Sequence, residues 1–80
     1  MRYVVIHRHV EGPIQFVKSF TDGVIAVDCA NDRLTRANIN AAFVVDDLKF
    51  IDSLGSLVAK NDSGTIKVTI MTENEWPCYS

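Results

Sequence analysis

Residues 46–60 read DDLKFIDSLGSLVAK, and this stretch decides the helical content of the fold. A step of 100° per residue places its apolar side chains within an arc of roughly 180°, and its polar side chains fill the opposite side. The pattern therefore predicts one amphipathic helix over residues 47–60. Asp46 is a suitable N-cap residue, and Val45 and Phe50 have the spacing of a hydrophobic staple at the start of this helix.

Four other stretches show the patterns of β-strands. Residues 2–10 are rich in β-branched and aromatic types, and residues 14–20 alternate between two faces. A turn with a glycine precedes a third apolar stretch over residues 24–29. Residues 65–72 show the clearest alternation in the chain and predict the last strand.

The stretch between the third strand and the helix is less regular. The apolar residues of 34–45 scatter around a helical wheel, which argues against one continuous helix. We expect a short helical turn over residues 32–37, capped by Asn31, and a strand over residues 41–45. Together the elements predict an α+β fold, in which a mostly antiparallel four- to five-stranded sheet carries the 47–60 helix on one face.

Length and composition limit the class of protein. The chain has 80 residues, of which 48% are hydrophobic and 22% charged, and its net charge is −2. We expect a single domain over residues 1–75 with a C-terminal tail over residues 76–80. The longest apolar run, Ala41 to Val45, is far shorter than the ~20 residues of a membrane span. These features predict a cytoplasmic protein that does not enter a membrane.

A short pattern of apolar residues links the expected 41–45 strand to the helix that follows it. Its members are Ala42, Phe43, Leu48, Phe50, Ile51 and Leu54. On these residues the chain, over about positions 14–72, resembles small accessory proteins of bacterial viruses. The resemblance implies binding to a host protein during takeover of the cell, as an inhibitor of an enzyme, toxin or defence factor. It transfers no site residue, because the matching positions are packing positions.

Few residues are candidates for catalysis or metal binding. His7 and His9 lie two apart in an expected strand, so their imidazoles point from one face, and Cys29 is a possible third ligand. The same three residues are a conceivable cysteine–histidine pair, but nothing in the sequence supplies an oxyanion donor or an orienting group. We therefore expect no catalytic residue, cofactor or metal, and rank a small enzyme or metal-binding protein third.

A basic patch is the basis of the second-ranked function. The basic side chains are Arg2, His7, Arg8, His9, Lys18, Arg33 and Arg36. Beside Tyr3, Phe16 and Phe20, they provide the mixture of charge and stacking surface that binds RNA or single-stranded nucleic acid. The net charge of −2 is far from the strongly basic balance at which phosphate contacts dominate binding.

Both faces of the expected sheet are partly apolar, which leads to the preferred function. The first strand presents Val4 and Ile6 on one face and Val5 on the other. One helix covers one face, so either these strands are central in the sheet or a second copy or partner covers the other face. We expect a non-enzymatic binding protein, homodimeric, that occludes a host protein. The residues expected to bind the partner are Asp46, Asp47 and Asp52 on the helix and Trp76 and Tyr79 in the tail.

Overall fold

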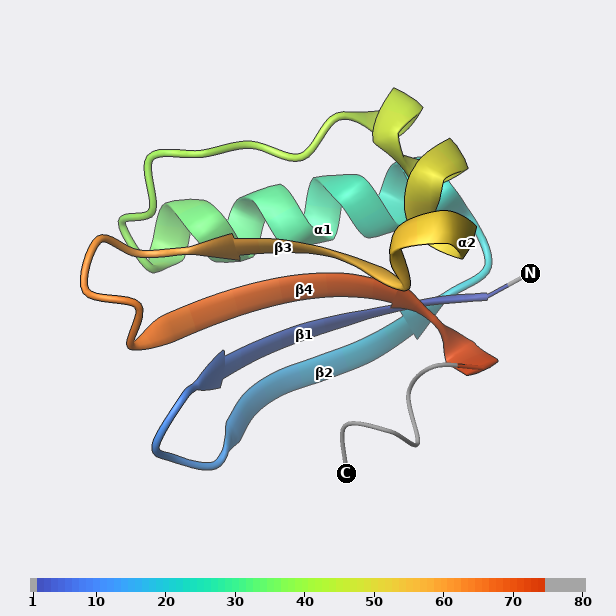
Figure 1. Ribbon diagram of the computed structural model, residues 1–80. Coiled ribbons are helices and arrows are strands. Elements are labelled where there is room, and N and C mark those ends of the chain that lie inside the picture. Colours follow the sequence, from blue (N-terminus) through green and yellow to red (C-terminus); the bar gives the residue numbers. More distant parts are fainter. Residues whose placement is uncertain (1, 75–80) are drawn as a thin grey trace.

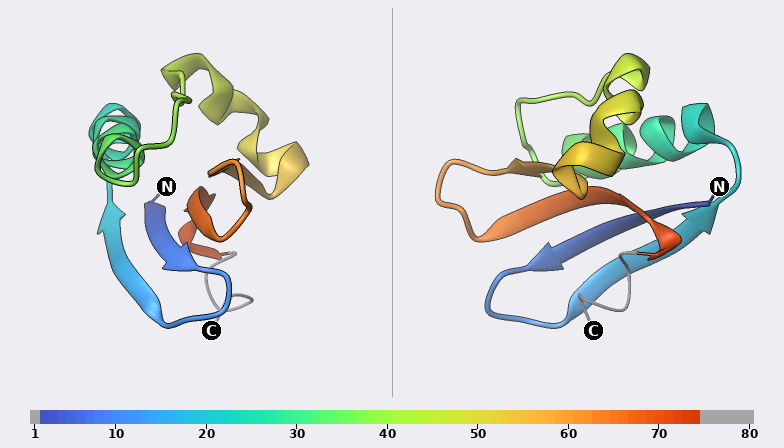
Figure 2. Two further views of the ribbon diagram at one scale, coloured as in Figure 1. Left: turned by 90° about the vertical axis from the view of Figure 1, so that its left-hand side faces the viewer. Right: turned by 45° about the vertical axis from the view of Figure 1, so that its right-hand side comes forward.

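The computed structural model describes residues 2–74, without the side chain of Asp52. The elements are β1 (Tyr3–His9), β2 (Ile14–Phe20), α1 (Gly23–Arg36), the 3-10 helix η1 (Val45–Phe50), α2 (Ile51–Leu54), β3 (Ser56–Lys60) and β4 (Ile66–Thr72). The strands form one antiparallel sheet in the order β2-β1-β4-β3. The helices lie on one face of this sheet (Figures 1 and 2). The α+β class, with a four-stranded antiparallel sheet and one main helix, is therefore confirmed.

The main helix is α1, so its expected position over residues 47–60 is wrong. Asp22 caps α1, because its carboxylate accepts a hydrogen bond of 2.9 Å from the Val24 N–H. The residues that α1 buries at helical spacing are Ala26, Val27, Ala30 and Leu34. This packing overrides the β-branched composition that predicted a strand over 24–29. The helical turn expected over 32–37 is the last part of α1.

The residues of the expected 47–60 helix divide among η1, α2 and β3. Gly55 ends α2 with a φ of 82°, a conformation that residues with a Cβ rarely adopt. The N-cap of η1 is Val44, and it makes no side-chain capping bond. The predicted N-cap role of Asp46, and the staple that depended on it, are therefore wrong. Periodicity alone did not separate a helix from a strand after Gly55, because the apolar run there is short.

The strand expected over residues 41–45 is an extended segment that belongs to the helix layer. Asn31 of α1 donates from Nδ2 to the Phe43 carbonyl oxygen at 3.1 Å, and its Oδ1 accepts from the Phe43 N–H at 2.7 Å. The side-chain amide of Asn31 thus makes the two hydrogen bonds to the Phe43 backbone that a neighbouring strand would otherwise make. The segment is tied to α1 and adds no strand to the sheet.

The main core lies between the helices and the sheet. Its buried residues are Val5, Ala26, Val27, Ala30, Leu34, Ile39, Ile51, Val68 and Ile70. On the other face of the sheet, a second cluster contains Val4, Ile6 and Met71, which are 3%, 1% and 0% exposed. The central position of β1 thus explains its two apolar faces. Val17 and Val58, which lie in register with Ile6 on this face, are 46% and 42% exposed, so the face is buried along its centre and open at both edge strands.

A β-bulge explains why Ile14 and Phe16 contact different clusters, although the alternation of β2 had placed them on one face. The register pairs His7 with Phe16 and Arg8 with Ile14, which leaves Gln15 as the extra residue. Phe16 therefore packs against the main core, whereas Ile14 packs against the second cluster.

The bond between Asn31 and Phe43 can be tested by unfolding. We expect Asn31→Ala to lower the free energy of unfolding by about 1–3 kcal/mol, because it leaves the part-buried N–H and C=O of Phe43 without their partner. Urea unfolding followed by circular dichroism measures this change. Asn40→Ala is the control, since this exposed residue should change stability by no more than about 0.5 kcal/mol. Equal stability of the two variants would contradict the role of Asn31.

Candidate functional site

The free edge of β3 borders a groove of about 430 Å³. All five residues of β3 line it, together with Ala41, Ala42, Phe43, Asp47 and Leu54. Successive side chains of a strand point to opposite faces, so a groove that touches five consecutive residues runs along the edge of the strand. Within residues 2–74, β3 pairs with β4 alone. The outward backbone groups of β3 are therefore directed toward this β3-edge groove.

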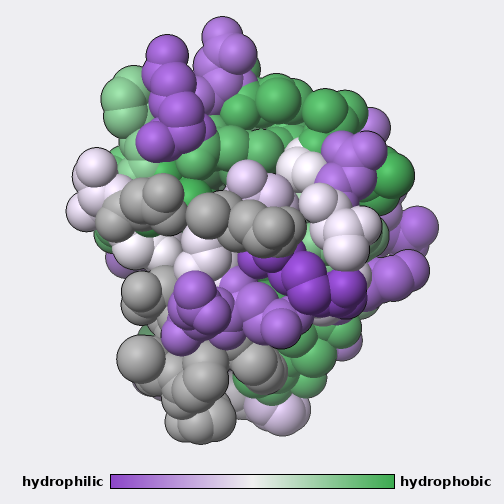
Figure 3. Space-filling view, turned by 90° about the vertical axis from the view of Figure 1, so that its right-hand side faces the viewer, coloured by the Kyte–Doolittle hydropathy of each residue, from purple (hydrophilic) through white to green (hydrophobic). Residues whose placement is uncertain are grey.

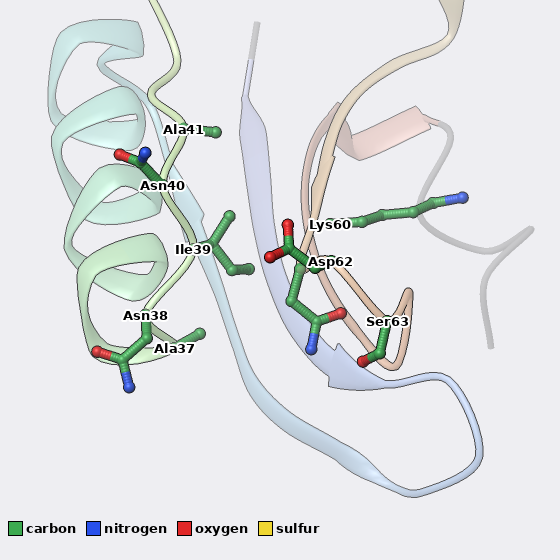
Figure 4. A pocket seen from close by; sticks show the side chains of 9 residues that line it. Ala37, Asn38, Ile39, Asn40, Ala41, Lys60, Asp62 and Ser63 are labelled. Atoms are coloured by element: carbon green, nitrogen blue, oxygen red, sulfur yellow. The ribbon is translucent and has the colours of Figure 1, made fainter.

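A second hollow of about 550 Å³ continues the groove beyond the end of β3. Residues 37–41 line one side of this hollow, and residues 60–63 line the other (Figure 4). The two hollows share Ala41 and Lys60. A recessed surface therefore extends along β3 and the turn that follows it.

Exposed apolar side chains lie beside the start of the β3-edge groove and within it. They are Val44, Val45, Phe50 and Leu54 in the helix layer and Val58 on the opposite face of β3, and each is between 41% and 65% exposed. Figure 3 shows apolar surface extending across the helix layer at this end of the molecule. Exposed apolar side chains that gather in this way are typical of interaction sites, whereas scattered ones are normal on any surface.

The two edges of the sheet differ in their protection against further strands. The β2 edge has a bulge beside Gln15 and a charged residue, Lys18, within the strand. Both features discourage the addition of another strand. The β3 edge is regularly paired with β4, and its middle residues are apolar, from Leu57 to Ala59. The β3 edge is therefore the one that is open to an incoming strand.

Two charged residues, Asp47 and Lys60, line opposite ends of the β3-edge groove, but Lys60 is in register with Lys67 and Arg8, so its side chain points to the sheet face away from the helices. Asp47 lines the groove from η1, the helix that leads through α2 into the start of β3. Lys60 lines it at the end of β3. A strand that pairs antiparallel with β3 would bring its C-terminal end to the Asp47 side and its N-terminal end to the Lys60 side.

Two of the predicted partner-binding residues lie at or near this groove. Asp46 and Asp47 are exposed in the first turn of η1, and Asp47 forms part of the groove wall. The side chain of Asp52 and all of Trp76 and Tyr79 lie outside the described part of the chain. The β3 edge was not predicted, because residues 56–60 were assigned to the expected 47–60 helix. The available signal was Gly55, which weakens a helix at that point.

Two cations and two phenylalanines meet where β2 approaches α1. The Arg33 guanidinium carbon lies 4.5 Å from the Phe16 ring centroid, and Lys18 Nζ lies 5.5 Å from that of Phe20. Arg33 Nε donates a hydrogen bond of 3.1 Å to His7 Nδ1. We call these five residues the Lys18–Arg33 cluster. It is the part of the predicted basic patch that the fold brings together.

Arg2, Arg8 and Arg36 lie elsewhere, whereas His9 stays close enough to His7 for its charge to act on it, so the patch is smaller than expected. Arg2 pairs with Glu73 at 2.9 Å, and Arg36 pairs with Asp32 at 2.8 Å. Arg8 pairs in register with Ile14, which packs in the second cluster on the other face of the sheet. His9 ends β1, two residues beyond His7.

His7 and Cys29, two of the three residues considered for catalysis or metal binding, are both neutral near pH 7. Burial lowers the pKa of His7, and the positive charges of Arg33 and His9 lower it further. An imidazole whose Nδ1 accepts a hydrogen bond is neutral and carries its proton on Nε2. Burial raises the pKa of the Cys29 thiol, although Arg33 and Lys18 act in the opposite direction. Cys29 is therefore a protonated thiol and lacks the thiolate character of a nucleophile.

The part of the chain that the structure describes also contains no group of metal ligands. Within residues 2–74, no three His, Cys, Asp or Glu side chains come together in a way that would hold a metal ion. His7, His9 and Cys29 are thus not combined into a metal site.

Comparison with protein-family models, curated proteins and solved structures finds no match to this chain. No helix within residues 2–74 is long and apolar enough to cross a membrane. The function is therefore inferred from the surfaces of the molecule itself.

The neutral state of His7 predicts a pH dependence of stability. Its pKa in the folded protein lies below the ordinary value of 6.5, so unfolding takes up a proton as the pH falls below that value. The His7 contribution to stability is complete above about pH 6.5 and decreases as the pH falls toward the pKa of the folded state. His7→Asn keeps an acceptor for Arg33 Nε but does not titrate.

We expect the urea midpoint of His7→Asn to change less between about pH 7 and pH 5 than that of the wild type. His9→Asn is the control and should keep most of the wild-type dependence, because it removes only the smallest of the three causes that lower the pKa of His7. If His7→Asn loses as much stability on acidification as the wild type, His7 is not responsible for the decrease.

Proposed function

We propose that this protein is a non-enzymatic binding protein that captures an extended segment of a partner protein on the free edge of β3. The supporting observation is the β3-edge groove, which touches every residue from Ser56 to Lys60. Strand addition supplies main-chain hydrogen bonds to an edge, and flanking hollows select the alternate side chains of the incoming segment. The exposed apolar side chains beside the groove supply further surface to be buried on binding.

Occlusion is the mode of action that follows from this geometry. A partner bound along β3 would lie against η1 and α2, so that part of its own surface would be covered. The resemblance to small accessory proteins of bacterial viruses names the partner class as a host enzyme, toxin or defence factor. Three of the residues that carry this resemblance, Ala42, Phe43 and Leu54, line the groove.

Val58→Glu tests the β3 edge, and Val17→Glu is its matched control. Val58 is 42% exposed on β3, and Val17 is 46% exposed on β2, the opposite edge strand. The two valines belong to one row across the sheet, in which Ile6 and Thr69 lie between them. Both substitutions therefore place the same new charge at equivalent positions of opposite edges.

In affinity capture from the natural host, we expect Val58→Glu to reduce recovery of the partner by about tenfold or more, because a charge would be buried in the interface. Val17→Glu should recover the partner as the wild type does. Mass spectrometry identifies the partner, and nuclease treatment before capture removes proteins held through RNA. Equal recovery with the two variants would contradict binding at the β3 edge.

The Lys18–Arg33 cluster supports a second candidate function, the binding of single-stranded nucleic acid. Neither Lys18 nor Arg33 forms an ion pair within residues 2–74. His7 occupies Arg33 Nε, which leaves the two Nη groups of the guanidinium for a phosphate. The nearby Phe16 and Phe20 rings hold the two cations in place.

Lys18→Glu tests this second candidate against Lys49→Glu. Both lysines are exposed and lie over a phenylalanine ring, with Lys49 Nζ 5.2 Å from the Phe50 centroid. By fluorescence anisotropy with a single-stranded RNA at about 50 mM salt, we expect Lys18→Glu to weaken binding roughly tenfold and Lys49→Glu to weaken it less. An RNA affinity that is absent in the wild type, or equal in the two variants, would exclude this function.

A further inference from the structure

We infer that the partner segment captured on the free edge of β3 has the order acidic, apolar, any residue, apolar, read from its N-terminus. This pattern rests on the proposed function, because it describes the extended segment that the β3-edge groove accepts. Three properties of β3 set the pattern: the direction of its backbone groups, the apolar walls beside one face of the strand and the charge on the other face.

Three of the five residues of β3 direct their backbone N–H and C=O groups to the free edge. Asn61, which follows β3, donates its N–H to the Ile66 carbonyl oxygen at 3.2 Å, so this N–H is directed to the β4 side. The direction alternates from one residue to the next in an antiparallel pair. The backbone groups of Ala59 and Leu57 therefore also face β4. The residues with outward groups are Ser56, Val58 and Lys60.

The side chains of these outward residues lie on the face of the sheet away from the helices. Val58 is in register with Thr69 and Ile6, and Ile6 belongs to the second cluster on that face. Leu57 and Ala59 point to the other face, where both pack against the main core. An incoming strand follows the same alternation, so its residues opposite Leu57 and Ala59 turn toward the helix layer.

The groove receives these two incoming side chains between apolar walls. Ala41, Ala42 and Phe43 line it on one side, and Leu54 of α2, which is 65% exposed, lines it near the start of β3. An apolar side chain that enters the groove buries this surface, whereas a polar one would lose its hydration. Asp47 is the charged residue of this wall, and its carboxylate disfavours an acidic residue there. Two apolar residues separated by one position therefore fit the groove.

Lys60 supplies the charge on the face away from the helices. Its side chain is exposed and is directed away from residues 37–41 (Figure 4), and it forms no ion pair within residues 2–74. Lys67 of β4 and Arg8 of β1 continue its row across the sheet. The incoming residue directly opposite Lys60 has its Cβ about 4.5–5.5 Å from that of Lys60, where an acidic side chain is attracted and a basic one is repelled. This residue of the segment is therefore acidic.

The direction of pairing gives the order of these residues along the segment. All the strands of this sheet pair antiparallel, and antiparallel pairing is more stable per residue than parallel pairing. The N-terminal end of the segment then lies at the Lys60 side. The acidic residue comes first, and the apolar residues opposite Ala59 and Leu57 come one and three positions later.

Titration of the purified full chain with synthetic peptides, followed by NMR of its backbone amides, tests this pattern. The probe is a capped peptide with the core Glu-Val-Thr-Val-Thr, and the comparison peptide has Lys in place of Glu. We expect the wild type to bind the acidic peptide about fivefold more tightly at about 20 mM salt, because the exchanged charge faces Lys60. Hydrogen exchange of the Val58 and Lys60 amides should slow in the complex, because their N–H groups become hydrogen bonded.

Two further changes separate the charge from the groove. Lys60→Glu should reverse the preference, so that the Lys peptide binds about fivefold more tightly than the Glu peptide, a result that loss of folding would not produce. Lys18→Glu makes the same change of charge on the opposite edge strand and should keep the wild-type preference. Serine in place of both valines of the acidic peptide should weaken binding by about tenfold or more, because the groove walls then lose their apolar contacts.

Any of three results would overturn this pattern. They are equal affinity of the wild type for the Glu and Lys peptides, no binding of the acidic peptide up to about 1 mM, or a dimer of the chain that the acidic peptide does not dissociate. The last result would make a second copy the occupant of the edge. Host capture with Val58→Glu tests the proposed function separately. Loss of the host partner in that variant, together with equal affinity for the two peptides, would refute the acidic pattern and leave the proposed function supported.

Discussion

The two hydrogen bonds between the Asn31 amide and the Phe43 backbone are the reason that the β3 edge of the sheet stays open. They hold the extended 41–44 segment against α1, so that this segment does not pair with β3. Without that constraint, an extended apolar segment beside an open strand would be expected to join the sheet and close its edge. The groove between this segment and β3 exists because a side chain, and not a strand, satisfies the Phe43 backbone.

The distribution of burial supports the proposed interaction surface at an edge of the sheet. Both faces of β1 are buried, one under α1 and the other in the second cluster of Val4, Ile6 and Met71. The β2 edge is bulged and charged, and its Lys18 lies over the Phe20 ring. The β3 edge combines regular pairing, apolar side chains and a recess, which together favour strand addition. One open edge thus accounts for the site of the proposed partner.

The candidate site was only partly predictable, because local sequence identifies some of its residues, whereas long-range contacts decide which of them come together. Asp46 and Asp47 were identified as acidic surface residues, and they do lie at or near the groove. Lys18, Arg33 and His7 were identified as basic residues, but the pairing of Arg2 and Arg36 with carboxylates reduces the expected patch to a small cluster. The neutral state of His7 depends on burial and on Arg33, which lies 26 residues away in the chain. Local spacing carries no information about such contacts.

The sequence by itself determined the α+β class and the strands β1, β2 and β4, because alternation with period two is a local property of the chain. It also contained the sign of a break at Gly55. Only the tertiary structure decided that residues 24–29 are helical and that 56–60 form a strand, since each choice depends on the surface against which the segment packs. The bulge at Gln15 and the bond from Asn31 to Phe43 were likewise decided by long-range contacts. The open edge that carries the proposed function is a product of those contacts and is therefore absent from any local pattern.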